Sequence, residues 1–494
     1  MLKFKIALFL VCWMCFLSVA YSQLNYNIKF KISGLKDTTC LIAYYYSNGT
    51  YIKDTLKVDH SGRCSYKSDS LPRGLYALVI TDKNYFDFVV NNDHKFSIET
   101  TVNSPSTHMV FKNSPENELF LGYLLKTHEK FDQMHELETR IKPYTKKDSA
   151  VIYASRQDSI TAAKRKQDTL ACYSKKVDSI NKVLINYRLS IVKEHPESFT
   201  ALMINTMKEP EIPEIPVLSN GRKDSTFAYH YYKSHYWDDC TFTDDRVLRT
   251  PVFHNKLKKY FDEIVIQDTD TIMREADLLI EKSRPNKEMF KYLVWFTTYH
   301  YENSEIMGFD KIFVHVVDKY YVTGQTSWIS KDINEKVIKK ANKLRPILIG
   351  EKAPNMVMQD TTLQLASLYN TKAKFLMILF WDPDCGHCQK EIPVIKDFYD
   401  LNKAKYGLEI FAVCTDSTLV KWKKGIKKFK MDWINVDGPR TVTGDFHASY
   451  DIISTPVIYL LDENKKIIAK HLSAEKIGLF LDNYIKSLKR KEKH

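Results

Sequence analysis

The pattern of hydrophobic and polar positions changes twice along this chain, and each pattern predicts a different kind of structure. Up to about residue 111, short segments such as residues 28–32 alternate apolar with polar side chains. Turn-forming clusters such as residues 47–49 separate these segments. Short alternating segments between turns are typical of antiparallel strands. We therefore predict a small antiparallel β domain, organised as a sandwich, over residues 23–113.

Long charged segments with helical periodicity follow from residue 114 onward. Ser114-Pro115-Glu116 has the composition of a helix start. Residues 209–216 alternate Pro with Glu and Ile, a composition that forms neither a strand nor a helix. After this rigid connector, apolar residues again recur at helical spacing. We predict an α-helical middle region over residues 114–345.

Strands and helices then alternate over residues 346–494. The apolar run at residues 373–380 predicts a buried strand. The other predicted elements are a helix (388–405), a strand (408–414), a helix (418–430), two strands (457–461 and 466–471) and a closing helix (475–488). This order predicts an α/β fold for the C-terminal domain.

Residues 1–22 have the features of a secretory signal peptide. Two lysines precede an apolar run, and small residues occupy the two positions that specify cleavage, Ala20 and Ser22. The run is about 14 residues long, shorter than the roughly 20 that a spanning helix needs. We expect cleavage before Gln23 and export to the periplasm. The sequence leaves open whether a partner holds the mature protein at a membrane.

Length and composition indicate several folded domains. At about 150 residues per domain, 494 residues suggest roughly three. The net charge is +13, but the basic runs at residues 421–430 and 486–493 carry no nucleic-acid-binding signature and are interpreted as solvated helix faces. Cys12 and Cys15 lie in the leader, and the cysteines that remain are odd in number and sparse. This cysteine usage argues against a disulfide-scaffolded fold.

One cysteine pair has a spacing that carries chemistry. Cys385 and Cys388 are separated by Gly386 and His387, between the predicted buried strand and the helix that follows it. A helix N-terminus stabilises the thiolate of the first cysteine, so Cys385 is predicted to attack and Cys388 to resolve the mixed disulfide. A partly cationic His387 would stabilise the Cys385 thiolate and make the couple more oxidising.

Two further positions are candidates for parts of the same site. Thr455 and Pro456 precede a predicted strand, where a cis-proline loop would turn the Thr455 backbone outward to pair with a substrate strand. Glu391, three residues past Cys388, is either a buried proton acceptor or an exposed helix carboxylate, and the sequence leaves both open. Neither the Cys385 region nor the cluster at residues 230–240 keeps metal-ligand spacing, so no metal and no cofactor are predicted.

The segment Phe380–Pro393, which contains Trp381 and the Cys-Gly-His-Cys sequence, resembles the TlpA/ResA-like branch of the thioredoxin superfamily when taken with Thr455-Pro456. The resemblance implies a thioredoxin-like fold and an exported thiol–disulfide oxidoreductase. It also implies that Cys385 and Cys388 form the redox pair, that Pro456 is the cis-proline and that Glu391 occupies the buried-acid position. The Gly-His dipeptide is more typical of disulfide isomerases, so the direction of electron flow stays open.

The order of the three regions also resembles multidomain thioredoxin-like proteins of the Bacteroidetes. We therefore predict a reductant or isomerase of cysteine-containing exported proteins, supplied by an upstream thiol donor, with no nucleic-acid partner. The alternative is an interaction protein whose β and helical domains carry the function while the disulfide is structural. Cys40 and Cys64 are predicted to be free or structural, and the sequence leaves open whether they pair.

Overall fold

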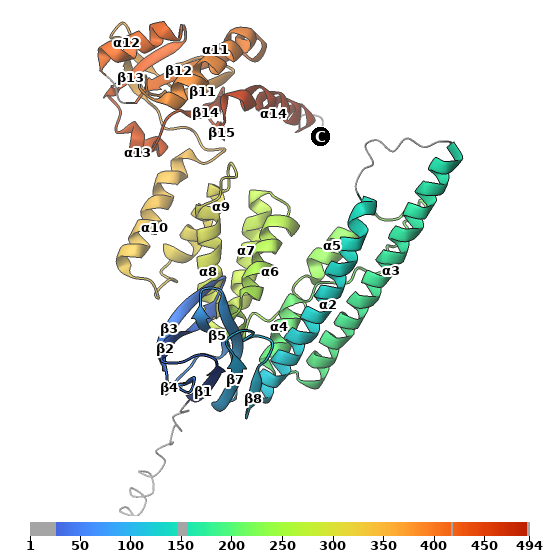
Figure 1. Ribbon diagram of the computed structural model, residues 1–494. Coiled ribbons are helices and arrows are strands. Elements are labelled where there is room, and N and C mark those ends of the chain that lie inside the picture. The colour runs from blue at the N-terminus through green and yellow to red at the C-terminus, as the bar shows by residue number, and fades with distance from the viewer. Residues whose placement is uncertain (1–25, 146–155, 416–417, 492–494) are drawn as a thin grey trace, which may run out of the picture. The chain divides into compact units, whose positions relative to one another are not determined.

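The computed structural model describes residues 26–145, 156–415 and 418–491 (Figure 1). The predicted leader, residues 1–22, lies outside the described residues. The chain divides into two compact units, one up to Ile264 and one from Val265 onward. Among the described helices, none combines the length and the apolar character that crossing a membrane requires.

The first unit begins with the predicted β domain, which is a sandwich of two four-stranded sheets. One sheet has the order β4-β1-β7-β8 and the other β3-β2-β5-β6. The pairings are antiparallel except for β1 with β7, which is parallel. The strands are β1 (Tyr26–Ser33), β2 (Thr38–Tyr46), β3 (Gly49–Val58), β4 (Arg63–Ser68), β5 (Gly74–Thr81), β6 (Asn84–Val90), β7 (Lys95–Thr101) and β8 (Val110–Lys112).

Two long helices follow and dock onto the sandwich. α2 and α3 lie side by side (Figure 1), and Asn117 near the start of α2 bonds to both backbone groups of Val89 on β6, at 2.7 and 2.8 Å. Glu116 accepts the backbone N–H groups of Phe199 and Thr200 and so holds α4 against α2. The helices of this unit are α2 (Pro115–Thr145), α3 (Arg156–Glu194), α4 (Phe199–Met207), α5 (Phe227–His235), η1 (Asp245–Arg249), α6 (Pro251–Lys259) and η2 (Tyr260–Ile264). Residues 209–216 form neither helix nor strand.

The helical region that the sequence predicts over residues 114–345 is shared between the two units. Its last part belongs to the unit that contains the C-terminal domain. There, Lys470 is 5% exposed, and its ammonium donates to the Asp310 carboxylate and, at 2.9 Å, to the Ile347 carbonyl. The helices are α7 (Thr269–Ser283), α8 (Lys287–Glu302), α9 (Asp310–Val316), η3 (Val317–Tyr321), α10 (Lys331–Leu344) and η4 (Arg345–Ile347).

The C-terminal domain is built on a seven-stranded sheet of order β10-β9-β13-β12-β11-β14-β15. β12 is parallel to β11 and to β13, and the other pairings are antiparallel. The strands are β9 (Val357–Asp360), β10 (Leu365–Ser367), β11 (Phe375–Trp381), β12 (Leu408–Cys414), β13 (Ile434–Thr441), β14 (Val457–Asp462) and β15 (Ile467–Lys470). The helices are α11 (Gly386–Tyr406), α12 (Leu419–Lys428), α13 (Phe446–Tyr450), η5 (Ala474–Lys476) and α14 (Ile477–Lys491).

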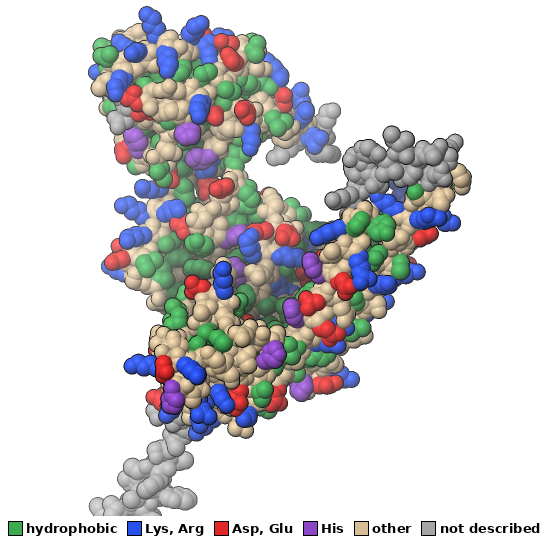
Figure 2. Space-filling model, viewed as in Figure 1, with side chains coloured by type: hydrophobic (Ala, Val, Ile, Leu, Met, Phe, Trp, Pro, Cys, Tyr) green, Lys and Arg blue, Asp and Glu red, His purple; other side chains and the backbone are tan. Residues whose placement is uncertain are grey.

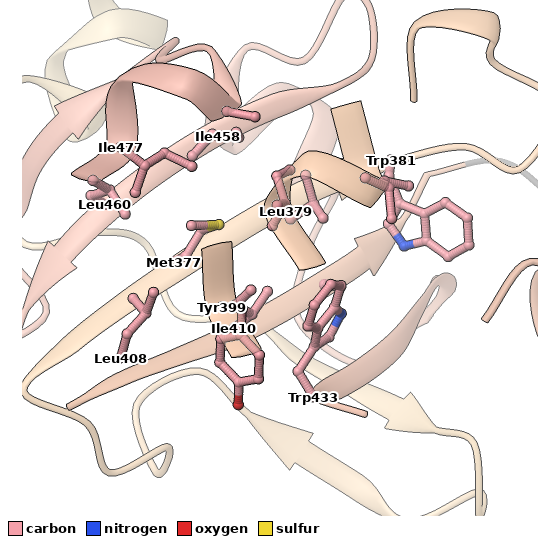
Figure 3. Close-up of a cluster of buried hydrophobic side chains, with 14 of the residues drawn as sticks. Met377, Leu379, Trp381, Tyr399, Leu408, Ile410, Trp433, Ile458, Leu460 and Ile477 are labelled. Atoms are coloured by element: carbon pink, nitrogen blue, oxygen red, sulfur yellow. The ribbon is translucent and has the colours of Figure 1, made fainter. Parts of the chain in front are cut away.

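Every residue of β11 is buried, because the sheet is covered on both faces. Alternate side chains of a strand point to opposite faces, and those of β11 enter two separate cores. Met377, Leu379 and Trp381 pack with Tyr399 of α11 and Ile477 of α14 (Figure 3). The residues between them pack on the other face with α13 and the end of α10. The order of elements predicted from the sequence is confirmed, and β9, β10, β13 and α13 are additions.

The backbones of β12 and β13 approach each other closely at one glycine. A Cβ atom added at Gly438 on β13 would lie 2.4 Å from the carbonyl oxygen of Cys414 and 2.7 Å from the ring of Phe446. A backbone oxygen cannot move aside without disturbing the strand that carries it. Gly438 is therefore required by the packing.

We expect the substitution Gly438→Ala to destabilise the C-terminal domain by about 1–3 kcal/mol, as overpacked sites do. The measurement is the urea concentration at which the buried thiol of Cys414 becomes open to alkylation in the full chain. Gly444→Ala is the matched control, because its added Cβ would meet no atom within 4 Å. An unchanged midpoint in the Gly438→Ala protein would contradict the packing described here.

Candidate dithiol site

The two cysteines of the Cys-Gly-His-Cys sequence lie at the start of α11, directly after the buried strand β11. The turn between β11 and α11 is closed by the backbone N–H of Cys385, which donates to the carbonyl of Asp382 at 3.2 Å. Cys385 is the N-cap residue of α11, and its sulfur accepts the backbone N–H of Cys388 at 3.4 Å. The attacking position therefore lies where the unpaired N–H groups of the helix converge.

The two thiols differ in accessibility. Cys385 is partly exposed, whereas Cys388 is completely buried in the core between α11 and the sheet. Neither thiol is engaged in a disulfide. Only the sulfur of Cys385 can meet another protein, so the structure supports the order of attack predicted from the sequence.

The environments of the two thiols move their pKa values in opposite directions. Partial burial acts to raise the pKa of Cys385, but hydrogen bonds from the Thr455 side chain and from the backbone N–H groups of Cys388 and His387 outweigh it. The pKa of Cys385 is therefore lowered. Burial raises the pKa of Cys388 to about 12. At neutral pH the exposed sulfur is the better nucleophile and the buried one keeps its proton.

The loop before β14 faces the cysteines. β14 pairs antiparallel with β11, with Val457 opposite Phe380, so the residues just before β14 lie beside the residues just after β11. The Thr455–Pro456 peptide bond is cis, as the sequence predicts. The thiol of Cys385 donates to the Thr455 carbonyl at 3.1 Å. Thr455 thus contacts the attacking sulfur through its backbone carbonyl as well as its side chain.

Glu391 lies one turn past Cys388 and is half-buried. Its Oε2 atom accepts the backbone N–H of Ala474 at 2.9 Å, at the start of η5. The carboxylate is therefore neither fully exposed nor enclosed, and it links α11 to the segment before α14. Its role as a proton acceptor stays a prediction.

The residues proposed to tune the site contribute in different ways. Gly386 and His387 are exposed, and His387 acts on Cys385 through its backbone N–H. Trp381 is fully buried, and its ring packs against Phe429 and lies close to Gly425 of α12. Trp381 therefore positions the site from within the core.

Two features beside the site were not anticipated from the sequence. Lys421 of α12 forms an ion pair with Asp384 at 2.6 Å, next to the attacking cysteine. Ile453 is 88% exposed two residues before Thr455. Neither has a sequence signal of its own, since a lysine in a basic run and an isoleucine in an apolar stretch are ordinary. Over the described ranges, no three His, Cys, Asp or Glu side chains gather closely enough to hold a metal ion.

Each of the three regions of the chain matches a protein-family model. The thioredoxin-like family model matches residues 373–467. Residues 26–120 and residues 188–346 match two families described as domains of unknown function, DUF4369 and DUF5106. The match at residues 188–346 crosses the division between the two compact units at Ile264.

Proteins similar to parts of this chain are named for thiol–disulfide chemistry or for likeness to thioredoxin. The thiol-disulfide oxidoreductase ResA of Bacillus thuringiensis is 29% identical over 141 residues, which is 28% of this chain and 78% of the relative. A solved domain of a possible thiol-disulfide isomerase from Cytophaga hutchinsonii is 43% identical and covers 29% of this chain and 97% of that one, with a TM-score of 0.27. A thioredoxin-like protein from Bacteroides caccae is 19% identical and covers 55% of this chain and 98% of that one, with a TM-score of 0.42.

Alkylation of the reduced protein should distinguish the two thiols. Because the pKa of Cys385 is lowered, its reaction with iodoacetamide should reach half-maximal rate at a lower pH in the folded chain than in urea. Cys388 should stay unmodified, since burial both hides it and raises its pKa to about 12. Peptide mapping after a timed reaction measures both rates. A midpoint for Cys385 that is equal in folded and unfolded protein would contradict the hydrogen bonds described above.

Proposed function

The chain belongs, through its C-terminal domain, to the TlpA/ResA-like branch of the thioredoxin superfamily, and we propose that it exchanges disulfides with cysteine-containing exported proteins in the periplasm. The observation that carries this proposal is the pairing of an accessible thiol of lowered pKa with a fully buried thiol one helical turn further on. In this proposal the protein acts as a reductant or isomerase, and an upstream thiol donor restores the dithiol.

The proposed reaction has two steps. The Cys385 thiolate attacks one sulfur of the client disulfide, a sulfur–sulfur bond forms, and the other client sulfur leaves as a thiolate and takes a proton. Cys388 then loses its proton and attacks the Cys385 sulfur. The client is released with two thiols, and its two added electrons come from the pair, which becomes a disulfide. In isomerisation the client's own thiolate displaces Cys385 instead, and no net electrons move.

Release of the proton from Cys388 is the demanding part of the second step, because the pKa of that thiol is about 12. We assign Glu391 as the proton acceptor. It follows Cys388 by three residues and so lies on the same side of α11. Its Oε2 atom already accepts from Ala474, so Oε1 is the atom left for the proton.

The Thr455 carbonyl gives the client a place to bind. In the reduced protein this oxygen accepts the proton of Cys385. Ionisation of Cys385 removes that donor, and the carbonyl becomes free to accept a backbone N–H from an extended client segment. Formation of the nucleophile and exposure of a client-binding acceptor are then the same event.

Replacing each cysteine in turn tests the proposal. Cys385→Ser should lower the rate of disulfide reduction by about two orders of magnitude or more, because the accessible nucleophile is lost. Cys388→Ser should still attack and should accumulate a mixed disulfide with the client, detected by mass spectrometry. Cys172→Ser is the matched control, since Cys172 is exposed on α3 far along the chain from the site. Full activity of the Cys385→Ser protein would favour the interaction-protein alternative.

The reduction potential of the Cys385–Cys388 couple indicates the direction of electron flow. Equilibration against glutathione or dithiothreitol gives the value, and about −270 mV is typical of a reductant and about −180 mV of an isomerase. His387→Pro should make the potential more negative, because proline fits the first helical turn but removes the N–H that donates to Cys385. Losing one hydrogen bond to a charged group costs about 1.5–3 kcal/mol, equivalent to roughly 30–60 mV.

His387→Ala separates the two contributions of that residue. It keeps the backbone N–H and removes the imidazole, so its potential should lie closer to that of the unaltered protein. A shift as large as that of His387→Pro would assign the effect to the imidazole and contradict the role given to the backbone.

A further inference from the structure

Two thiols outside the redox site lie in contact within the β-sandwich. Cys40 is on β2 and Cys64 is on β4, so they belong to different sheets. Their sulfur atoms are 3.7 Å apart, and the residues are 1% and 9% exposed. This separation is ordinary contact between two sulfur atoms, compared with about 2.0 Å in a disulfide bond.

The turn between β3 and β4 explains how such short side chains meet across a sandwich. Facing sheets normally lie about 10 Å apart, whereas the Cα atoms of two bonded cysteines lie about 4.4–6.8 Å apart. β3 and β4 belong to different sheets, so the turn carries the chain from one sheet to the other. At its first end, the Asp59 carbonyl accepts from the Asp37 backbone next to β2, and at its second end, the Gly62 carbonyl accepts from Ile32 of β1. This short turn is tied to both sheets and keeps them close beside the thiols.

We propose that Cys40 and Cys64 form a structural disulfide that joins the two sheets of the sandwich. Each thiol loses a proton, and the pair gives two electrons to an oxidising protein disulfide of the export compartment, which is reduced to two thiols. A bond between the sulfurs needs only a small rotation of each side chain, because they already touch. The bond closes a loop that contains all of β3 and the turn after it.

The order of folding and oxidation follows from burial. The oxidant must reach a sulfur directly, and the folded core leaves little of either one accessible. The bond therefore forms before the sandwich closes over it. Once closed, the same core protects it from attack by a protein thiolate, including that of another copy of this chain. The pair thus stays oxidised in a chain whose C-terminal domain is proposed to open disulfides.

The test uses the full chain, produced with its own leader and recovered from a bacterial periplasm. The protein is unfolded in urea with N-ethylmaleimide and without reductant, and then digested with trypsin. Cleavage after Lys53 and Arg63 separates the cysteines into peptides 37–53 and 64–67. We expect mass spectrometry to find these two peptides joined, and to find the joined species lost when dithiothreitol precedes the maleimide.

Cys240 and Cys414 serve as internal controls, because both are buried in the folded protein and should carry the maleimide. Their labelling shows that urea exposed buried thiols in the helical region and in the C-terminal domain. Maleimide on both Cys40 and Cys64 in the same sample would overturn the proposal and leave the two thiols with a packing role. No substitution is involved, so a failure to fold cannot produce that result.

Discussion

The antiparallel pairing of β14 with β11 is the constraint on which the dithiol site depends. It sets Val457 opposite Phe380, and the loop before one strand therefore lies beside the turn after the other. The chain segments that carry Cys385 and Thr455 are 70 residues apart in sequence. Because both strands are buried in the same sheet, the contact between the sulfur and the carbonyl does not depend on the flexibility of either loop.

The sequence predicts those parts of the C-terminal domain whose signal is local. The apolar run of β11 and the cysteine spacing at the start of α11 are readable without the fold. β13 was missed because its sequence, Ile434–Thr441, contains Asp, Gly and Pro, residues that are depleted in strands. Its extended backbone is held by pairing with β12 and β9, partners that no local pattern reveals.

Side-chain environments were harder to predict than elements, since they depend on residues distant in sequence. The Glu391 carboxylate is held by the backbone N–H of Ala474, 83 residues away. Trp381 belongs to the cysteine motif in the sequence, but in the fold it is a core residue under α12. The sequence marks a connector inside the helical region at residues 209–216, whereas packing divides the region after Ile264. Tertiary contacts, and not local secondary-structure propensity, decide the surroundings of both side chains and the place where the helical region divides.

The buried ammonium of Lys470 gives the boundary of the redox domain a practical meaning. A fragment cut at residue 346, where the sequence pattern changes, would keep Lys470 and discard the Asp310 carboxylate that neutralises it. An unpaired charge in a core is far more costly than a missing apolar contact. It would also discard Leu344, which packs against the second face of the sheet. The part of this chain that keeps both contacts therefore includes α9 and α10, so these two helices pack as part of the same unit as the sheet.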